Sequence, residues 1–163
     1  MILLKLVFTY ILVGFLWLLH WLPLPVLRAL GSLLGRLLYV FGHERRKVAL
    51  INLRLCFPEK TEAEREDLAR RHFVTFSQAV LDRTLGWWAS KERLERIIRI
   101  RGVEHLNDPD GKPVIILSPH FVGLDAGATR ISMFVRGCSV YSNQKNPVFN
   151  KLLYDGRIRF TEA

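Results

Sequence analysis

Residues 114–127 read VIILSPHFVGLDAG, in which four apolar residues run directly into Ser-Pro-His and an aspartate follows five positions after the histidine. A short apolar run bounded by turn residues is typical of a buried strand. In open α/β sheets, reactive groups collect at the carboxyl ends of the strands. The stretch therefore predicts an α/β fold, a mixed sheet flanked by helices, with His120 at the end of a strand over residues 114–117.

The spacing of His120 and Asp125 predicts a general base and its orienting carboxylate. Gly123 lets the chain turn tightly between them, so that Asp125 can return to one imidazole nitrogen. The carboxylate would fix the ring tautomer, and the other nitrogen would take a proton from a hydroxyl. A bare H-x4-D also arises by chance. Ser118 makes a poor nucleophile beside His120, because adjacent strand residues point to opposite faces and no elbow glycine pattern surrounds it.

Local signals place other elements along the chain. Residues 97–106, IIRIRGVEHL, alternate apolar and basic residues as a half-buried strand would. Thr61 and Glu64 form a capping box that predicts a helix over residues 62–85. Asn146 and Pro147 predict the start of another helix, which ends near residue 156.

The first forty-one residues contain no Asp or Glu and only three formal charges, whereas all 15 acidic residues lie beyond them. Residues 2–22 are almost continuously apolar, about the twenty residues that a membrane-spanning helix needs. We therefore expect residues 1–22 to form a transmembrane anchor; a cleaved signal peptide is the alternative. The excess of Lys and Arg after this segment predicts that the rest of the chain lies on the cytoplasmic side.

Residues 23–42 predict a second, amphipathic helix. Arg28, Ser32 and Arg36 are spaced four apart and share one face, while the rest is apolar. Such a helix can lie in a membrane surface, or it can pack on its own domain. Gly31 and Gly35 form a small-xxx-small pair, which is weak evidence for helix pairing. Residues 43–163 are then expected to be the catalytic part.

The net charge of +9 is compatible with an anionic partner, but the distribution of the basic residues does not favour nucleic acid. Basic residues are scattered rather than clustered with stacking aromatics, and the aromatics are enriched in the apolar segment. Anionic membrane lipid, a phosphorylated substrate or an acidic carrier protein fits the charge better. Cys56 and Cys138 stand far apart without a C-x-x-C pair, so neither a metal site nor a disulfide framework is indicated.

The segment IILSPHFVGLDAG resembles the H-x4-D/E block of the lipid A biosynthesis acyltransferases, the lauroyl and myristoyl transferases of the glycerolipid acyltransferase-like superfamily. NLRLCFPE (residues 52–59), RGVEHL (101–106) and NQKNPVFNKLLYDGRIR (143–159) resemble that family in order and spacing. The resemblance implies that His120 deprotonates a hydroxyl of a lipid A precursor and that Asp125 supports it. The hydroxyl would attack an acyl-carrier-protein thioester at the bacterial inner membrane, without metal or cofactor.

The same resemblance implies substrate-binding roles for Arg159, Arg157 and, less directly, Lys145. Arginine suits both a developing oxyanion and the phosphates of a lipid A precursor. Taken without the resemblance, Arg157 and Arg159 lie beyond a helix end, where arginine is favourable for purely structural reasons.

Members of this family continue for about as long again, so the sequence is expected to be an amino-terminal half with an incomplete sheet. Two other functions remain open: a membrane-bound fragment without activity, and a hydrolase in which His120 and Asp125 activate water. An acyl-coenzyme A donor is also compatible with the resemblance. The sequence does not indicate the acyl-chain length, the acceptor position or the oligomeric state.

Overall fold

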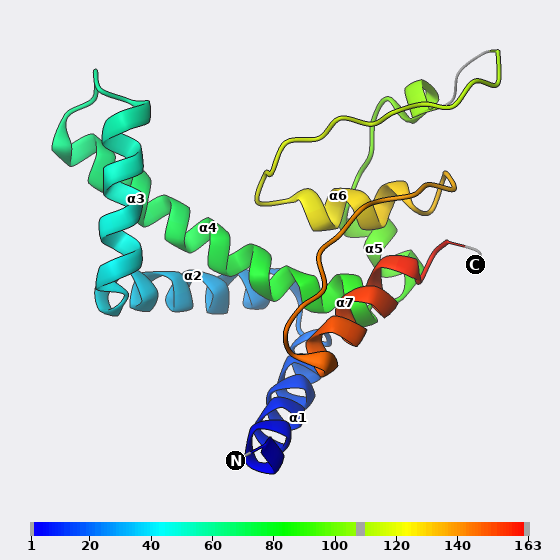
Figure 1. Cartoon of the computed structure of the whole chain (residues 1–163), viewed down its shortest axis with the longest axis horizontal. Coiled ribbons are helices and arrows are strands. Elements are labelled where there is room, and N and C mark those ends of the chain that lie inside the picture. The colour runs from blue at the N-terminus through cyan, green and yellow to red at the C-terminus, as the bar shows by residue number, and fades with distance from the viewer. Residues whose placement is uncertain (1, 107–109, 162–163) are drawn as a thin grey trace. The chain divides into compact units, whose positions relative to one another are not determined.

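The structure of the protein is a computed structural model that describes residues 2–106 and 110–161, with side chains from residue 6 onward. Its elements are helices (Figure 1): α1 (Ile2–Leu19), α2 (Leu24–Phe41), α3 (His43–Cys56), α4 (Glu62–Trp88), α5 (Lys91–Ile97), the 3-10 turn η1 (Val103–Leu106), α6 (Leu124–Ile131) and α7 (Pro147–Ile158). The chain divides into two compact units. Unit 1 comprises residues 1–21 and 82–163, and unit 2 comprises residues 22–81.

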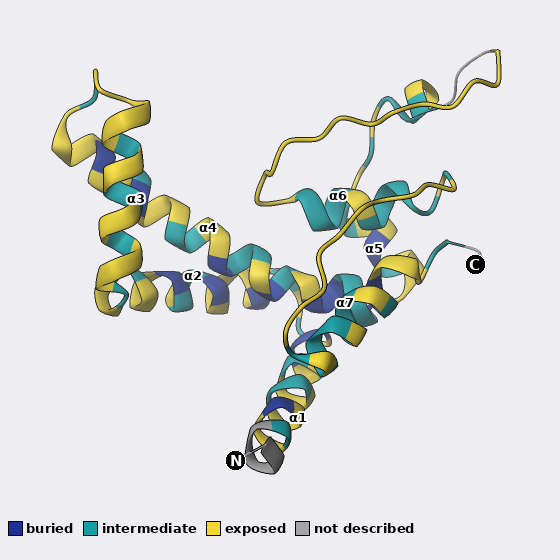
Figure 2. Cartoon of the chain, viewed as in Figure 1, coloured by how far each residue is buried: buried dark blue, intermediate teal, exposed yellow. Residues whose placement is uncertain are grey.

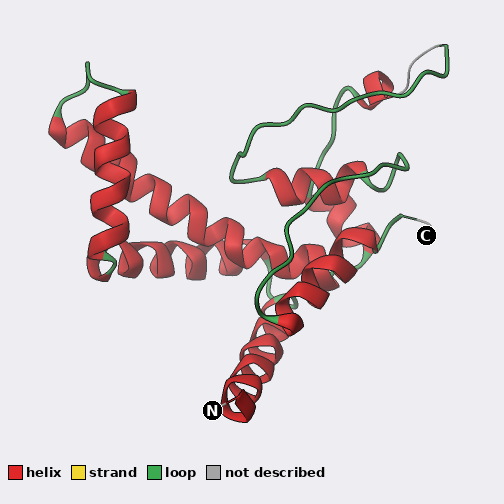
Figure 3. Ribbon diagram, viewed as in Figure 1, coloured by secondary structure: helices red, strands yellow, loops and turns green. Residues whose placement is uncertain are grey.

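The predicted α/β fold with a mixed sheet is wrong for the residues described, which contain helices and loops but no strand (Figure 3). Residues 114–117 form an exposed loop, in which Ile115 and Leu117 are each 94% exposed. Residues 97–106 pass from the end of α5 through a loop into η1. Apolar patterning selects a strand only when a neighbouring segment supplies hydrogen-bond partners for its backbone. Among the described residues no segment pairs with either stretch.

In unit 2, α2 packs on α4 through its small and polar face. A Cβ atom built on Gly35 would lie 2.5 Å from the Cα atom of Val74, and one on Gly31 would lie 2.7 Å from the Cα atom of Gln78. The Nε2 atom of Gln78 also donates to the Ser32 hydroxyl at 2.8 Å. The glycine pair, which was weak evidence in the sequence, thus marks a close helix–helix approach.

A capping box marks the start of α4, and an ion pair links α4 to α3. The Thr61 backbone N–H donates to the Glu64 carboxylate at 2.7 Å, and the Glu64 backbone N–H donates back to the Thr61 hydroxyl at 3.3 Å. This confirms the predicted capping box, although α4 extends three residues beyond the predicted end. The hydrogen bonds lower the pKa of the Glu64 carboxyl, and the Thr61 backbone contributes most. Arg54 of α3 also forms an ion pair with Glu62 at 2.9 Å.

The outward face of α2 is apolar and exposed (Figure 2). Its exposed large side chains are Val26, Leu30, Leu33, Leu37, Leu38, Val40 and Phe41. Among the described residues, α2 is the helix that is long and apolar enough to cross a membrane, whereas the apolar helix over residues 6–19 is shorter. Length and composition alone are weak evidence for a span. The transmembrane anchor over residues 1–22 stays a prediction.

Unit 1 contains α1, the end of α4, α5, α6 and α7. At the end of α1, His20 is buried, with ring centroids 4.6 Å from Trp21 and 6.0 Å from Trp88. The His20 carbonyl accepts a hydrogen bond from Arg93 of α5. Arg130 of α6 donates to the Ile98 carbonyl at 3.2 Å, which ties α6 to the end of α5. These contacts join α1 with the ends of α4 and α5, and α5 with α6.

Candidate functional site

His120 lies in the loop that leads into α6. The chain turns immediately after it, with the Phe121 N–H donating to the Pro119 carbonyl at 2.9 Å and the Leu124 N–H to the Phe121 carbonyl at 3.1 Å. Its side chain is exposed, and in the described part of the chain it takes part in no hydrogen bond or ion pair. The imidazole is therefore accessible to a substrate.

Asp125 is the second residue of α6 and stands in its first turn. A carboxylate is favourable there because the unpaired N–H groups of the helix start attract negative charge. Its Oδ2 atom pairs with Arg83 Nη2 of α4 at 2.6 Å, and its Oδ1 atom lies 4.0 Å from Arg157 Nη2 of α7. Asp125 thus joins three helices of unit 1, with Oδ2 engaged and Oδ1 only loosely contacted. It makes no described hydrogen bond with His120.

Arg157 is an exposed residue near the end of α7, with few restraints on its guanidinium group. The guanidinium lies over the Tyr141 ring, 5.2 Å from its centroid, and the Tyr141 ring is 6.4 Å from that of Tyr154. Such stacking orients an arginine without neutralising its charge. Its contact with Asp125, at 4.0 Å, is at the limit of an ion pair. Arg157 can therefore bind an anion.

Arg159 holds the end of α4. Its Nη1 and Nη2 atoms donate to the carbonyls of Gly86 at 2.8 Å and Ala89 at 2.9 Å. Carbonyls at a helix end lack partners within the helix, and an arginine supplies them. Burial lowers the pKa of the Arg159 guanidinium, although the residue as a whole is exposed, and the group stays charged at neutral pH. Two of its five N–H donors are engaged in this structural contact.

Lys145 and the start of α7 lie together. Lys145 is exposed, and the described residues offer it no hydrogen bond or ion pair. The next residue, Asn146, caps α7, because its Oδ1 atom accepts from the N–H groups of Val148 at 3.0 Å and Phe149 at 3.2 Å. This confirms the predicted helix start. The Asn146 Nδ2 atom also donates to the Thr9 hydroxyl of α1 at 3.2 Å.

Two residues of this arrangement were missed in the sequence, namely Arg83 and Tyr141. The available signal for Arg83 was weak, because residues 80–88 read VLDRTLGWW and Arg83 stands there beside a second charged residue, Asp82. Nothing in the sequence singles out Tyr141, because its partner Arg157 lies on a separate element. Within the ranges 2–106 and 110–161, no cluster of three or more His, Cys, Asp or Glu side chains could hold a metal ion.

The matches to known proteins all point to one family. The family model described as bacterial lipid A biosynthesis acyltransferase matches residues 2–163. The lipid A biosynthesis lauroyltransferase of Escherichia coli (strain K12) is 33% identical over 157 residues, which are 95% of this chain and 51% of that protein. The myristoyltransferase of the same strain is 34% identical over 139 residues, which are 83% of this chain and 42% of that protein.

A lipid A biosynthesis acyltransferase of Haemophilus influenzae is 30% identical over 85% of this chain and 45% of its own length. The chain thus spans about half the length of the curated relatives that it matches. No solved structure matches it.

Proposed function

The chain belongs to the bacterial lipid A biosynthesis acyltransferase family, and from this we propose that it transfers a fatty acyl chain from a thioester donor to a hydroxyl of a lipid A precursor. The family match over residues 2–163 is the observation that carries the proposal. His120 lies in an exposed loop, and Asp125 follows in the first turn of α6; this arrangement supports the proposal.

His120 acts as the general base in this proposal. One imidazole nitrogen takes the proton of the acceptor hydroxyl while its oxygen attacks the thioester carbonyl carbon. The carbon–sulfur bond then breaks, and the imidazolium returns the proton to the departing sulfur. The products are an ester and a free thiol, so that His120 ends in its starting state.

Asp125 positions the imidazole and stabilises its protonated form. Its Oδ2 atom stays paired with Arg83, at 2.6 Å, which fixes the carboxylate on α6. Its Oδ1 atom is left for the second ring nitrogen of His120, because its contact with Arg157 is loose, at 4.0 Å. The turn at Gly123 and the exposed loop allow His120 to approach when the substrate binds. Catalytic hydrogen bonds often tighten only in the substrate complex.

Basic residues after the catalytic loop would bind the anionic parts of the substrates. Arg157 presents an accessible guanidinium, which can contact a phosphate of the acceptor or the oxyanion that forms during attack. Arg159 can contribute its remaining N–H donors next to the α4 end, and Lys145 can add charge from the loop before α7. The net charge of +9 favours an acidic acyl-carrier protein as the donor.

The membrane supplies the acceptor lipid. We place the chain at the bacterial inner membrane, with α1 as the anchor, α2 at the lipid surface and the catalytic residues on the cytoplasmic side. Exposed apolar side chains on both helices support this, among them Phe8 at 68% and Phe41 at 73% exposure. In water, such surfaces would be unfavourable by about 25 cal/mol per Å².

The test follows the consumption of acyl-carrier-protein thioester by membranes that carry the chain, with and without a lipid A precursor. We expect consumption that requires the acceptor. His120→Ala should lower the rate by about 10²- to 10⁴-fold, the usual contribution of a general base. His105→Ala is the matched control, because His105 is an exposed histidine on η1, and it should leave the rate unchanged.

Two outcomes would overturn the proposal. Thioester consumption without acceptor, accompanied by free fatty acid, would show a hydrolase that uses water. No consumption by a folded, membrane-bound chain would show a protein without this activity. Replacing the donor with acyl-coenzyme A at equal concentration determines whether the carrier protein is required.

A further inference from the structure

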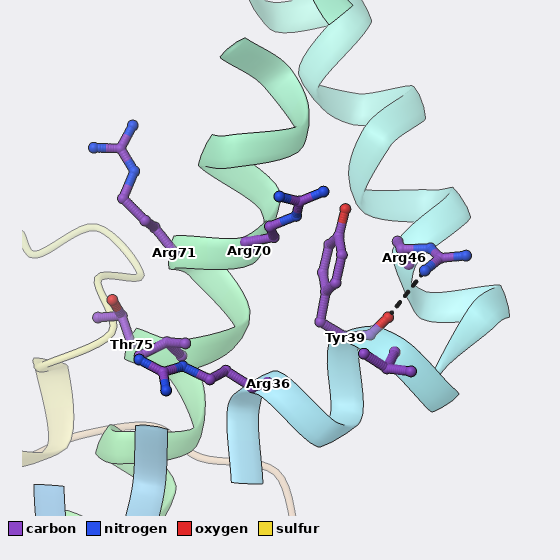
Figure 4. Close-up of a pocket in the computed structure, with 8 residues that line it drawn as sticks. Arg36, Tyr39, Arg46, Arg70, Arg71 and Thr75 are labelled. Atoms are coloured by element: carbon purple, nitrogen blue, oxygen red, sulfur yellow. Dashed lines mark hydrogen bonds between the residues drawn. The ribbon is translucent and has the colours of Figure 1, made fainter. Parts of the chain in front are cut away.

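Unit 2 contains an open pocket of about 780 Å³ between α2, α3 and α4 (Figure 4). This volume is within the range of ligand sites. Half of its lining residues are arginines and none is acidic. The lining residues are Arg36, Tyr39, Val40, Arg46, Arg70, Arg71, Val74 and Thr75.

Tyr39 organises two of these arginines. Figure 4 shows its ring standing between Arg46 of α3 and Arg70 of α4. The Cζ atoms of the two guanidinium groups lie 5.3 Å and 5.5 Å from the ring centroid. Arg46 also donates through Nη1 to the Tyr39 carbonyl at 3.3 Å. Both contacts of Arg46 with Tyr39 involve uncharged groups, so they orient the guanidinium group while its positive charge is retained.

The charge of the pocket is only partly compensated. Arg70 pairs with Glu66 at 3.3 Å and Arg71 with Asp67 at 2.8 Å, but all four side chains are at least half exposed. Such surface pairs are worth little. In the part of the chain that the structure describes, Arg36 and Arg46 form no ion pair. Four arginines thus face two weakly paired carboxylates, which suits an anion.

Apolar side chains accompany these arginines. Val40 and Val74 belong to the lining of the pocket, and Leu37 and Phe41, which follow Arg36 and Val40 in the sequence of α2, are 46% and 73% exposed. An arginine fork recognises phosphate in a bidentate manner, and apolar side chains beside it accommodate an acyl chain. A nucleic acid would leave these apolar side chains uncovered. The combination of charge and apolar surface favours an amphiphile.

We propose that this pocket binds the phosphate headgroup of an anionic membrane lipid, with an acyl chain of the lipid lying along α2. The site belongs to unit 2, whereas His120 and Asp125 belong to unit 1, so lipid binding in this pocket does not require acyl transfer. It would hold α2 and α4 at a phosphate-rich membrane surface.

The experiment uses the full chain in neutral detergent micelles and measures bound lipid by native mass spectrometry. The probes are short-chain phosphatidic acid and phosphatidylcholine of the same chain length. We expect phosphatidic acid to bind and phosphatidylcholine to bind much more weakly. The double variant Arg36→Gln/Arg46→Gln should weaken phosphatidic acid binding about tenfold or more, as expected for the loss of charged hydrogen bonds.

Two further variants test whether a loss of binding comes from this pocket and not from the lower net charge or from misfolding. Arg99→Gln/Arg101→Gln removes the same charge from exposed positions outside the pocket and should change binding less than about twofold. Tyr39→Leu removes the aromatic platform without changing the charge, and it should weaken binding while the helical circular dichroism signal stays intact.

Three results would overturn the proposal. An equal loss of binding in both arginine pairs would show an effect of net charge alone. Displacement of the lipid by inorganic phosphate at similar concentration would show a site for free phosphate. Displacement by a short oligonucleotide would show a nucleic-acid surface. Acyl-transfer activity plays no part in these readouts, so its absence would leave the result unaffected.

Discussion

The close approach of α2 and α4 makes Gly35→Ala the most informative change in unit 2. A Cβ atom at residue 35 would lie 2.5 Å from the Cα atom and 2.8 Å from the N atom of Val74, and 2.6 Å from the Phe73 carbonyl oxygen. All three are backbone atoms. Since ordinary contacts begin at 3.4 Å, the helices would have to separate by about 0.9 Å. Side-chain movement cannot relieve this clash.

The expected loss of stability follows from two opposing contributions. Overpacking in a close contact costs about 1–3 kcal/mol. Alanine in place of glycine within a helix returns about 1 kcal/mol. Because backbone atoms meet the new methyl group, we expect the upper part of the first range and a net loss of about 1–2 kcal/mol. For a chain of 163 residues, this lowers the midpoint of unfolding by roughly 2–8 °C.

The assay is thermal unfolding of the chain in detergent micelles, followed by circular dichroism of the helices. Gly14→Ala is the matched control, because it makes the same change within α1 and no described atom lies within 4 Å of the new Cβ apart from its chain neighbours and the backbone of its own helix. Its midpoint should stay constant or rise. Adding Val74→Ala to Gly35→Ala should not restore stability, because the clash involves the Val74 backbone. A Gly35→Ala chain as stable as wild type would refute the packing of α2 on α4.

Three further predictions concern caps and the candidate site. Thr61→Ala should destabilise the chain by about 1 kcal/mol in denaturant unfolding. Because the pKa of the Glu64 carboxyl is lowered in the folded chain, the capping box should stabilise the chain above about pH 4.5 and lose this effect as the pH falls. The stability of Glu64→Gln should lack that pH dependence. Asn146→Ala should lower the unfolding midpoint, and Asn146→Asp should lower it much less, since aspartate keeps the cap and loses only the donor to Thr9. Equal midpoints for the two variants would contradict the cap. Arg83→Gln should lower kcat for acyl transfer by up to about a hundredfold with little change in KM, because Asp125 loses its partner; a raised KM with unchanged kcat would instead assign Arg83 to substrate binding.

The correct sequence predictions depended on partners that lie close along the chain. Thr61 and Glu64 cap each other across three residues, and Asn146 caps N–H groups two and three residues away. Such contacts are specified by local sequence. The helix starts could therefore be located to within a residue.

The wrong prediction and the contacts that the sequence did not reveal depended on partners that lie far apart in the chain. Residues 114–117 have the composition of a strand, but a strand exists only when another segment pairs with its backbone. The ion pair between Arg83 and Asp125 joins helices far apart in the sequence, so no local pattern reveals it. The resemblance did identify the family, because its motifs recur in order along the whole chain, and the comparisons confirm the family.

The roles of His120 and Asp125 remain predictions, and one measurement tests the role of His120, the central one, most directly. It is the mass of a lipid A precursor after incubation with an acyl-carrier-protein thioester and membranes that carry the chain. We predict a product heavier by one acyl group with the wild-type chain and with His105→Ala, and at most about a hundredth as much product with His120→Ala at equal expression and over the same initial period. A similar yield of acylated product in His120→Ala, or a wild-type chain that leaves the precursor mass unchanged, would contradict the proposed chemistry.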